Sequence, residues 1–353
     1  MQIYADHLAA HLKQGLRSLY TVHGNEPLLV QEAVDAIRAT ARQSGYTERT
    51  SHTVQGANYD WGEVVAATQS LSLFADRQIV EIHVPGGKPG KEGSQALQQV
   101  AESAQGNDGT LVIVTLPRLD KQTKASAWFV ALENQGVTVP VESVERNALP
   151  QWIAQRLRLQ GQHVAAGAEG EHALRFFADR VEGNLLAAHQ EVQKLGLLYT
   201  HGELSAQQIE AAVLNVARYD VFKLSEAVLA GQFERVQRMM DGLQAEGESE
   251  VLVHYALAED IRALKRVREA LDQGKPLPMA LREQRIWGMR ERLFERVAPR
   301  MTATSLAGLL HAAHVVDGIV KGIKSPDWPV DSWQALQRLA LQLCRQATEA
   351  RPR

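Results

Sequence analysis

The sequence predicts an α/β domain followed by an all-α region, and three observations support this prediction. Helical and strand-like segments alternate along residues 1–143. Strand-like segments then stop near Pro150, and every later stretch of periodic apolar residues has helical spacing. Strands separated by helices imply parallel pairing, with helices on both faces of a sheet. The 353 residues suffice for two or three domains, because single cores stop growing near ~250–300 residues.

The expected strands of the α/β domain are short and bounded by turn residues. They cover residues 18–23, 49–55, 78–84, 110–116 and 137–141. The helices between them are expected at 5–14, from 26 onward, at 61–70, at about 91–104 and at 125–133. Pro27 suits the first turn of the second helix.

The later part divides into two helical sets at turn-rich breaks. A small set is expected at 152–160, 170–181, 185–199 and 205–214. A larger set follows at 221–229, 233–243, 251–271, 278–281, 287–297, 304–322 and 332–348. The predicted domains are therefore 1–143, 144–216 and 217–353.

Composition describes an ordinary globular protein without a dominant polyanion-binding surface, since the net charge is −3. Residues 218–353 nevertheless carry 21 Lys and Arg against 18 Asp and Glu, which permits nucleic-acid contact there. A single cysteine, Cys344, excludes an internal disulfide and a cysteine-built metal site. Apolar runs fall short of the ~18 residues of a membrane span, and residues 1–6 lack a signal-peptide pattern. We expect a cytoplasmic protein without membrane contact.

The segment after the first strand, Gly24-Asn25-Glu26-Pro27-Leu28-Leu29-Val30-Gln31, stands where a nucleotide-binding α/β domain carries its phosphate loop. A working loop ends in Gly, Lys and Ser or Thr, which allow close backbone approach, bind phosphate and coordinate magnesium. Here these positions hold Leu29, Val30 and Gln31. The sequence therefore predicts that the fold is kept and the nucleotide chemistry is lost.

Other positions offer no replacement for that chemistry. The segment 86–92 contains a Gly-Lys pair after a strand, but Pro85 replaces the required Gly and Glu92 the metal-binding Ser or Thr. The acidic motif that would coordinate magnesium and activate water is also absent. Glu81 alternates as an ordinary outward residue of its strand, and Asp120 lacks an acidic neighbour. Arg118 is interpreted as a surface charge. We expect no catalytic residues, no metal and no cofactor.

An adjacent apolar pair, Leu73-Phe74, lies between the third helix and the third strand, with Leu71 two residues earlier. Connections are normally polar, so such a pair costs solubility unless something covers it. Either the pair packs under its own domain, or a partner protein covers it. Asp76 and Arg77 would then form a polar rim.

Several segments together resemble the delta subunits of bacterial DNA polymerase III clamp loaders. The resemblance rests on Leu71-Ser72-Leu73-Phe74, on the segment 24–29, on Glu182-Gly183-Asn184-Leu185-Leu186-Ala187, on Arg285-Ile286-Trp287 and on the ending 333–344. It therefore touches all three predicted domains.

The resemblance implies a degenerate AAA+-type parallel-sheet domain, a helical lid domain and a C-terminal helical collar domain. It implies a non-catalytic subunit that binds the sliding clamp (the beta subunit) and opens it for loading on primed DNA during replication. The collar would join a five-membered assembly of clamp-loader subunits. No intrinsic ATPase is expected, and classification as a DNA-directed DNA polymerase would follow only from membership of the holoenzyme. Leu71, Leu73 and Phe74 would contact the clamp.

Candidate DNA contacts are Lys321, Lys324 and Trp328, where the family uses an aromatic residue. Trp328 would stack on a base near a primer end while the lysines bind phosphates; collar packing with ordinary surface lysines is the alternative. Arg285, Arg290 and Arg292 around Trp287 are a weaker candidate. His311 and His314, near Asp317, are interpreted as a solvated or packing face.

Two other functions compete with this interpretation. One is an ATPase of the same fold with an unconventional phosphate loop, which predicts measurable ATP binding. The other is a helical adaptor that only scaffolds an assembly. The adaptor predicts that changes at Leu73 and Phe74 damage folding rather than one selective contact.

Overall fold

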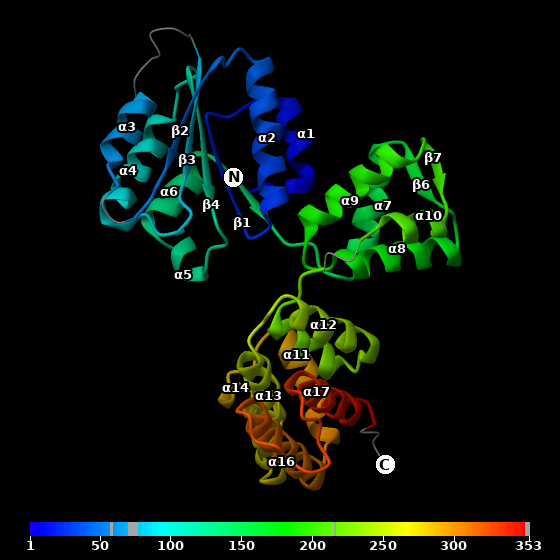
Figure 1. Cartoon of the computed structure of the whole chain (residues 1–353). Helices are drawn as coiled ribbons and strands as arrows, with labels where there is room; N and C mark the ends of the chain where they lie inside the picture. The colour runs from blue at the N-terminus through cyan, green and yellow to red at the C-terminus, as the bar shows by residue number, and fades with distance from the viewer. Residues whose placement is uncertain (57–58, 70–76, 215–216, 350–353) are drawn as a thin grey trace. The chain divides into compact units, whose positions relative to one another are not determined.

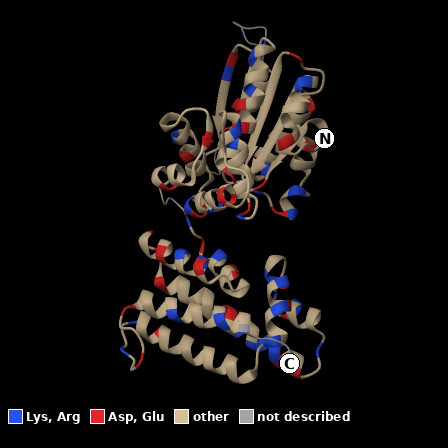
Figure 2. Cartoon of the chain, turned by 90° about the vertical axis from the view of Figure 1, so that its right-hand side faces the viewer, with Lys and Arg blue, Asp and Glu red and all other residues tan. Residues whose placement is uncertain are grey.

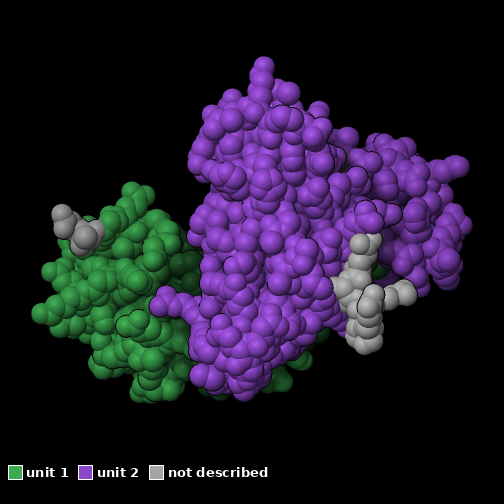
Figure 3. Space-filling view, turned by 90° about the horizontal axis from the view of Figure 1, so that it is seen from below, with its two compact units in different colours: residues 1–156 green, residues 157–353 purple. Residues whose placement is uncertain are grey.

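The computed structural model describes residues 1–56, 59–69, 77–214 and 217–349 of the chain. It forms two compact units, Met1–Arg156 and Leu157–Arg353 (Figure 3). The first unit is α/β, and the second is helical apart from one small sheet. The finer division at residues 143 and 216 stays a prediction.

The first unit contains five strands and the helices between them. The strands are β1 (Leu19–Gly24), β2 (Glu48–Thr53), β3 (Gln78–His83), β4 (Thr110–Leu116) and β5 (Val137–Val141). Its helices are η1 (Ala5–His7), α1 (Leu8–Gln14), α2 (Pro27–Gln43), α3 (Trp61–Gln69), α4 (Gly90–Ser103), α5 (Lys121–Lys124) and α6 (Ala127–Gln135). Helix α7 (Leu149–Leu159) follows β5 and contains residues of both units. All five expected strands are present, with ends shifted by at most two residues.

The five strands form one parallel sheet in the order β2-β3-β4-β1-β5, which confirms the predicted fold class. Helices α1 and α2 cover one face, while α3, α4 and α6 cover the other (Figure 1). Successive side chains of a strand point to opposite faces. Tyr20 and Val22 of β1 accordingly enter the core under α1 and α2, whereas Leu19 enters the opposite core.

Close contact between β1 and its neighbour β5 fixes the end of β1. Gly24 pairs with Val141, and a Cβ atom on Gly24 would lie 2.1 Å from the Val141 carbonyl oxygen. Only glycine fits this approach. The chain then turns into α2, which begins at Pro27.

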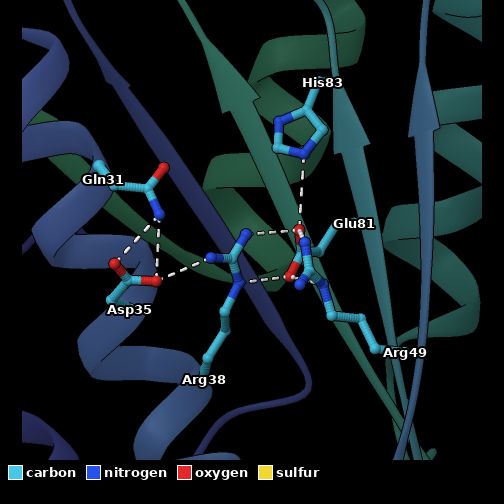
Figure 4. A network of polar contacts seen from close by, with 6 residues as sticks. All are labelled: Gln31, Asp35, Arg38, Arg49, Glu81 and His83. Atoms are coloured by element: carbon cyan, nitrogen blue, oxygen red, sulfur yellow. Dashed lines mark hydrogen bonds and ion pairs between the residues drawn. The ribbon is translucent and has the colours of Figure 1, made fainter.

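Glu81 of β3 is buried and faces α2, so the expectation of an ordinary outward residue is wrong (Figure 4). Arg38 of α2 makes a two-pronged contact with it, Nε–Oε1 at 2.5 Å and Nη2–Oε2 at 2.7 Å. Arg49 of β2 lies 2.9 Å from Oε1, and His83 Nε2 lies 3.5 Å from Oε2. Asp35 Oδ1 accepts a hydrogen bond from Arg38 at 2.7 Å. The outward face of β3 is therefore covered by a helix rather than by solvent.

The partners of Glu81 keep it ionised. Burial by itself raises its pKa, but hydrogen bonds from His83 and Arg38 and the charges of Arg38 and Arg49 outweigh burial and lower the pKa to about 2. Because a buried charge is stable only when it is paired, the network ties α2 and β2 to β3.

The second unit contains a small helical part and a larger bundle. Its elements are β6 (Gln162–Val164), α8 (Ala168–Val181), α9 (Leu185–Leu198), β7 (Gly202–Leu204), α10 (Ala206–Ala212), α11 (Val221–Ala230), α12 (Phe233–Ala245), α13 (Glu250–Asp272), α14 (Leu277–Glu283), α15 (Met289–Val297), η2 (Ala298–Arg300), α16 (Ala303–Val320) and α17 (Ser332–Glu349).

The strands β6 and β7 correct the expectation that strands stop near Pro150. They pair in parallel over three residues each, which is too short for a period of two to be visible in the sequence. The buried Gln162 side chain stabilises the pair by donating to the carbonyls of Leu195 and Tyr199, both at 3.0 Å.

Helix α16 is the one helix among the described residues that is long and apolar enough to cross a membrane. Its apolar side chains, including Leu306, Leu309 and Val316, enter the core of the bundle, where α16 contacts α13 and α17. A third of this apolar helix is buried inside the bundle. Charged residues of both signs are interspersed along the chain (Figure 2).

We predict that Glu81→Gln destabilises the α/β unit in a pH-dependent way. With a folded pKa of about 2 against an ordinary 4.5, ionised Glu81 contributes about 3 kcal/mol at neutral pH. That contribution is present above the unfolded pKa and is lost as the pH falls through the folded pKa. Urea unfolding should show a gap between wild type and variant that is constant above about pH 5 and narrows toward pH 3.

Glu102→Gln, at an exposed position of α4, serves as the control and should leave the unfolding free energy nearly unchanged. A gap for Glu81→Gln that does not vary with pH contradicts the charge network.

Candidate functional site

The apolar segment after α3 is bounded by described residues on both sides. Leu71, Leu73 and Phe74 lie in the segment 70–76, outside the described residues. The segment follows Gln69, where α3 ends, and precedes Arg77, next to the first residue of β3. Its two ends therefore belong to a core helix and a core strand.

Hydrogen bonds fix both ends of this segment to the α/β unit. The buried Gln78 side chain donates to the Ala67 carbonyl of α3 at 3.0 Å and lies 3.3 Å from Thr110 Oγ1 of β4. Arg77 donates to the Ser44 carbonyl at the end of α2, at 2.6 Å, and its guanidinium lies over the Tyr46 ring. Arg77, expected in a polar rim, thus also contacts its own domain.

The residues at the phosphate-loop positions have other roles. Leu29 and Val30 lie in the first turns of α2 and pack against the core beneath that helix. The Gln31 amide donates to both carboxylate oxygens of Asp35 at 3.0 Å. None of the three supplies the lysine ammonium or the Ser or Thr hydroxyl that a phosphate loop uses at these positions.

A pocket of about 380 Å³ nevertheless lies at the carboxyl ends of β1, β4 and β5, where ligands bind in open parallel sheets. His23, Arg118 and Lys124 line it together with Glu142 and Glu145. Burial and the charge of Lys124 lower the pKa of His23 to about 4, so this imidazole is neutral at pH 7. The pocket thus mixes charges of both signs and has no concentrated positive charge for a triphosphate. Arg118, interpreted as a surface charge, is exposed at its rim.

Metal chemistry finds no support in the residues that the structure describes. No group of three or more His, Cys, Asp or Glu side chains among them is placed to hold an ion. On α16, Asp317 pairs with Lys321, at 2.6 Å, and lies 3.8 Å from His254 of α13. Cys344 is buried, and burial raises its pKa to about 11, so it is an unreactive core residue at neutral pH.

The turn Glu182-Gly183-Asn184 lies between α8 and α9 and contacts residues at the start of the C-terminal bundle. The Glu182 carboxylate pairs with Arg235 of α12, and its carbonyl accepts from the Arg218 amide at 2.8 Å. Gly183 has a φ of 75°, and a Cβ there would lie 1.9 Å from the Arg218 carbonyl oxygen. Asn184 caps α9 by accepting from the Ala187 amide. The role of this turn is therefore structural: its contacts hold the small helical part against Arg218 and α12.

The predicted DNA-contacting residues lie at the turn between α16 and α17. Lys321 is exposed and paired with Asp317, while Lys324 is exposed without a hydrogen bond or ion pair to any described residue. Trp328 is half-buried against the bundle core, and the Arg338 guanidinium lies over its ring, 4.3 Å from the centroid. The structure thus brings the three residues into one turn and adds Arg338. Nothing in the sequence points to Arg338, because only the return of α17 brings its side chain to Trp328.

The residues of the weaker DNA-binding candidate around Trp287 differ in their surroundings. Arg290 is half-buried and pairs with the buried Asp260, so its charge is already used within the bundle. Trp287 is 57% exposed, and Arg285 and Arg292 are exposed with no ion pair to a described residue. Arg285 also has a φ of 54°, an uncommon conformation for a residue other than glycine.

Comparison with known proteins gives one consistent family. Residues 20–142 match the model of "DNA polymerase III, delta subunit". The chain is 28% identical to DNA polymerase III subunit delta of Escherichia coli, with 98% of this chain and 96% of that protein covered. It is 25% identical to the Haemophilus influenzae subunit delta, with 97% and 99% covered.

A solved structure shares the fold over the same length. The DNA clamp loader delta protein of Bacillus subtilis superposes with a TM-score of 0.52 at 16% sequence identity, covering 97% of this chain and 99% of that one. The similarity therefore spans both compact units.

We predict that Gly183→Ala lowers the free energy of unfolding, because an L-residue is strained at this φ and its Cβ meets the Arg218 carbonyl. The matched control is Gly247→Ala, with a φ of 72° and nothing within 4 Å of its Cβ. The control should cost about 1 kcal/mol and Gly183→Ala about 2 kcal/mol or more, measured by urea unfolding. Equal losses would show that the contact with Arg218 is unimportant.

Proposed function

We propose that the chain is a delta subunit of the DNA polymerase III clamp loader, and that it binds the ring-shaped sliding clamp and opens it for loading on primed DNA. The observation that carries the proposal is the apolar segment Leu71–Phe74, set between a core helix and a core strand of the α/β unit. As a clamp-loader subunit it functions in a complex with other subunits, which we propose to number five in total.

Leu73 and Phe74 form the proposed contact with the clamp, and Leu71 adds a third apolar side chain. Two adjacent large apolar residues that fill a partner's pocket have the character of an interface hot spot. Burial of each contributes about 1.5–3 kcal/mol. The anchoring of both ends through Gln78 and Arg77 supports this role, because a fixed base reduces the ordering cost of binding.

Opening of the ring follows from a difference in affinity. If the contact fits the open clamp better than the closed one, binding shifts the ring toward the open state by no more than that difference. The chain needs no chemical step of its own for this shift. Partner subunits that bind ATP would expose or cover the contact.

We propose that the chain does not hydrolyse ATP. Leu29 and Val30 pack against the core, and Gln31 bonds to Asp35, so the side chains at these positions cannot replace a phosphate-binding lysine and a magnesium-binding hydroxyl. The mixed charges around His23 support the same conclusion. An ATPase with an unconventional loop would instead require stoichiometric ATP binding by the isolated chain.

DNA contact is proposed for the turn that carries Lys321, Lys324 and Trp328. Lys324 has no ion pair with a described residue and is available to bind a phosphate. Lys321 would have to give up its ion pair with Asp317 to do so. A base can stack on Trp328 once Arg338 moves from the ring, or on the Arg338 guanidinium plane itself. The exposed Trp287 with Arg285 and Arg292 is a second candidate of the same chemistry.

We predict that the double variant Leu73→Ala/Phe74→Ala lowers affinity for the cognate clamp at least about 100-fold, because two apolar anchors are lost. The matched control is Leu197→Ala/Leu198→Ala, which truncates an adjacent pair on α9 that is 88% and 57% exposed. Binding is measured by surface plasmon resonance, with melting temperatures taken in parallel.

Unchanged clamp binding with a lowered melting temperature in the first variant would make Leu73 and Phe74 core residues and favour the scaffolding adaptor. Loss of clamp binding by the control pair would place the contact elsewhere.

We predict that Lys324→Gln in the assembled loader weakens primed-DNA binding and reduces the slope of log K against log salt by about 1, because one phosphate contact is lost. The control is Lys265→Gln, which removes a lysine already paired with Glu269 on α13. Fluorescence anisotropy at several salt concentrations measures both quantities. An unchanged salt slope for Lys324→Gln would remove this residue from the DNA contact.

A further inference from the structure

The pocket of about 380 Å³ at the carboxyl ends of β1, β4 and β5 has no role in the proposed clamp and DNA contacts. Every residue that lines it belongs to the first compact unit. Arg77, which borders the proposed clamp contact, precedes β3 and therefore lies beside the amino ends of the parallel strands. The pocket is thus a separate feature, at the opposite edge of the same sheet.

A buried histidine of β1 faces this pocket without a polar partner. His23 is 5% exposed and lines the pocket, and its ring makes an edge-to-face contact with Phe129. Neither of its ring nitrogens has a hydrogen bond to a described residue. A neutral imidazole offers one donor and one acceptor, and buried polar groups are normally satisfied. The ring therefore points to a polar ligand in the pocket.

Charges of opposite sign come from different sides of the pocket. Arg118 and Lys124 lie in the segment that follows β4, whereas Glu142 and Glu145 follow β5, and β1 runs between these two strands. Neighbouring strands are ~4.8 Å apart, so the two sides are separated by roughly 10 Å. Arg118, Lys124 and Glu142 form no ion pair with a described residue. The pocket is therefore basic on the β4 side and acidic on the β5 side.

The basic side matches the charge of a single phosphate. A phosphomonoester carries about 1.5–2 negative charges at neutral pH, which Arg118 and Lys124 together balance. The acidic residue between them, Asp120, does not line the pocket and instead caps α5 by accepting from the Thr123 amide at 2.6 Å. A second or third phosphate would extend toward the carboxylates that follow β5, which repel it. A monophosphate therefore fits better than a triphosphate.

The remaining lining fits the uncharged part of such a ligand. Leu119 and Pro140 supply apolar surface, while Asn25 and Ser143 supply an amide and a hydroxyl group. In nucleotide-binding α/β domains an acidic side chain accepts hydrogen bonds from ribose hydroxyls, and Glu142 can accept in the same way. A ligand with a phosphate at one end and hydroxyl or amino donors at the other therefore satisfies both sides of the pocket.

We propose that this pocket binds a phosphomonoester with hydroxyl or amino donors at its other end, namely a sugar phosphate or a nucleoside monophosphate. Arg118 and Lys124 bind the phosphate, Glu142 accepts hydrogen bonds from the donors, and the His23 imidazole contacts the ligand between them. No bond is made or broken, so the pocket is a binding site without a catalytic role. The proposal does not depend on the proposed clamp contact.

The test uses the full chain and isothermal titration calorimetry at pH 7, with ribose 5-phosphate, adenosine 5′-monophosphate, inorganic phosphate and ATP as separate probes. Equal affinity for the first two probes identifies a sugar phosphate site. Affinity for adenosine 5′-monophosphate at least about tenfold higher identifies a nucleoside monophosphate site. ATP should bind at least about tenfold more weakly than the better of the two, because its additional phosphates meet the carboxylates.

Two variants with a matched control test the assigned contacts. Lys124→Gln should weaken binding of the better probe about tenfold, because one of the two charges on the phosphate is lost. Lys121→Gln is the control, since Lys121 is exposed on the same helix but does not line the pocket, and it should leave the affinity unchanged. Glu142→Ala should weaken the better probe about threefold or more but strengthen binding of inorganic phosphate, because repulsion is removed. The ring nitrogen signals of His23 should shift in NMR spectra when the better probe is added.

Absence of binding by all four probes overturns the proposal, as does equal weakening by Lys124→Gln and Lys121→Gln. Tighter binding of ATP than of adenosine 5′-monophosphate also overturns it and would favour the ATPase with an unconventional loop. Clamp affinity measured on the same variants separates this proposal from the proposed function. Lost probe binding in Lys124→Gln with unchanged clamp affinity supports the pocket, whatever the outcome for Leu73 and Phe74.

Discussion

Pairing of the buried Glu81 carboxylate is the constraint on which the arrangement of the α/β unit depends. A charge inside a sheet covered on both faces is tolerated only with partners, so α2 must present Arg38 and β2 must present Arg49. This requirement sets α2 against β3 and sets the edge strand beside it. β3 is also the strand that follows the segment 70–76, and Gln78 at its start binds α3 and β4. The proposed clamp contact thus directly precedes a strand that is tied to α2, α3 and β4.

The same arrangement is consistent with the proposal that this parallel-sheet unit does not hydrolyse ATP. Helix α2 is held by Arg38 in its middle and by Leu29 and Val30 packed into the core near its start. The side chains at the phosphate-loop positions of this chain stabilise the helix. We propose that the chain functions through contacts at its surface: the segment 71–74 for the clamp, and the α16–α17 turn for DNA.

Much of the fold was predictable because its signals are local. Four of the five parallel strands are rich in buried apolar residues, while β2 is polar, and β4 and β5 begin and end at the expected residues. The pairs that matter most were not predictable, since they join residues distant in sequence. Glu81 alternates in its strand like an exposed residue, and only the position of α2 shows that Arg38 covers it. Arg338 was missed for the same reason, and β6 and β7 are too short to produce a period.

Amide hydrogen exchange of the chain with and without the sliding clamp tests the central claim most directly. The account predicts that clamp binding slows exchange in residues 70–77, while residues 24–31 and the C-terminal helices exchange as in the free chain. Slowed exchange confined to the C-terminal bundle, with residues 70–77 unchanged, would contradict the account, because the clamp would then be held by a different surface.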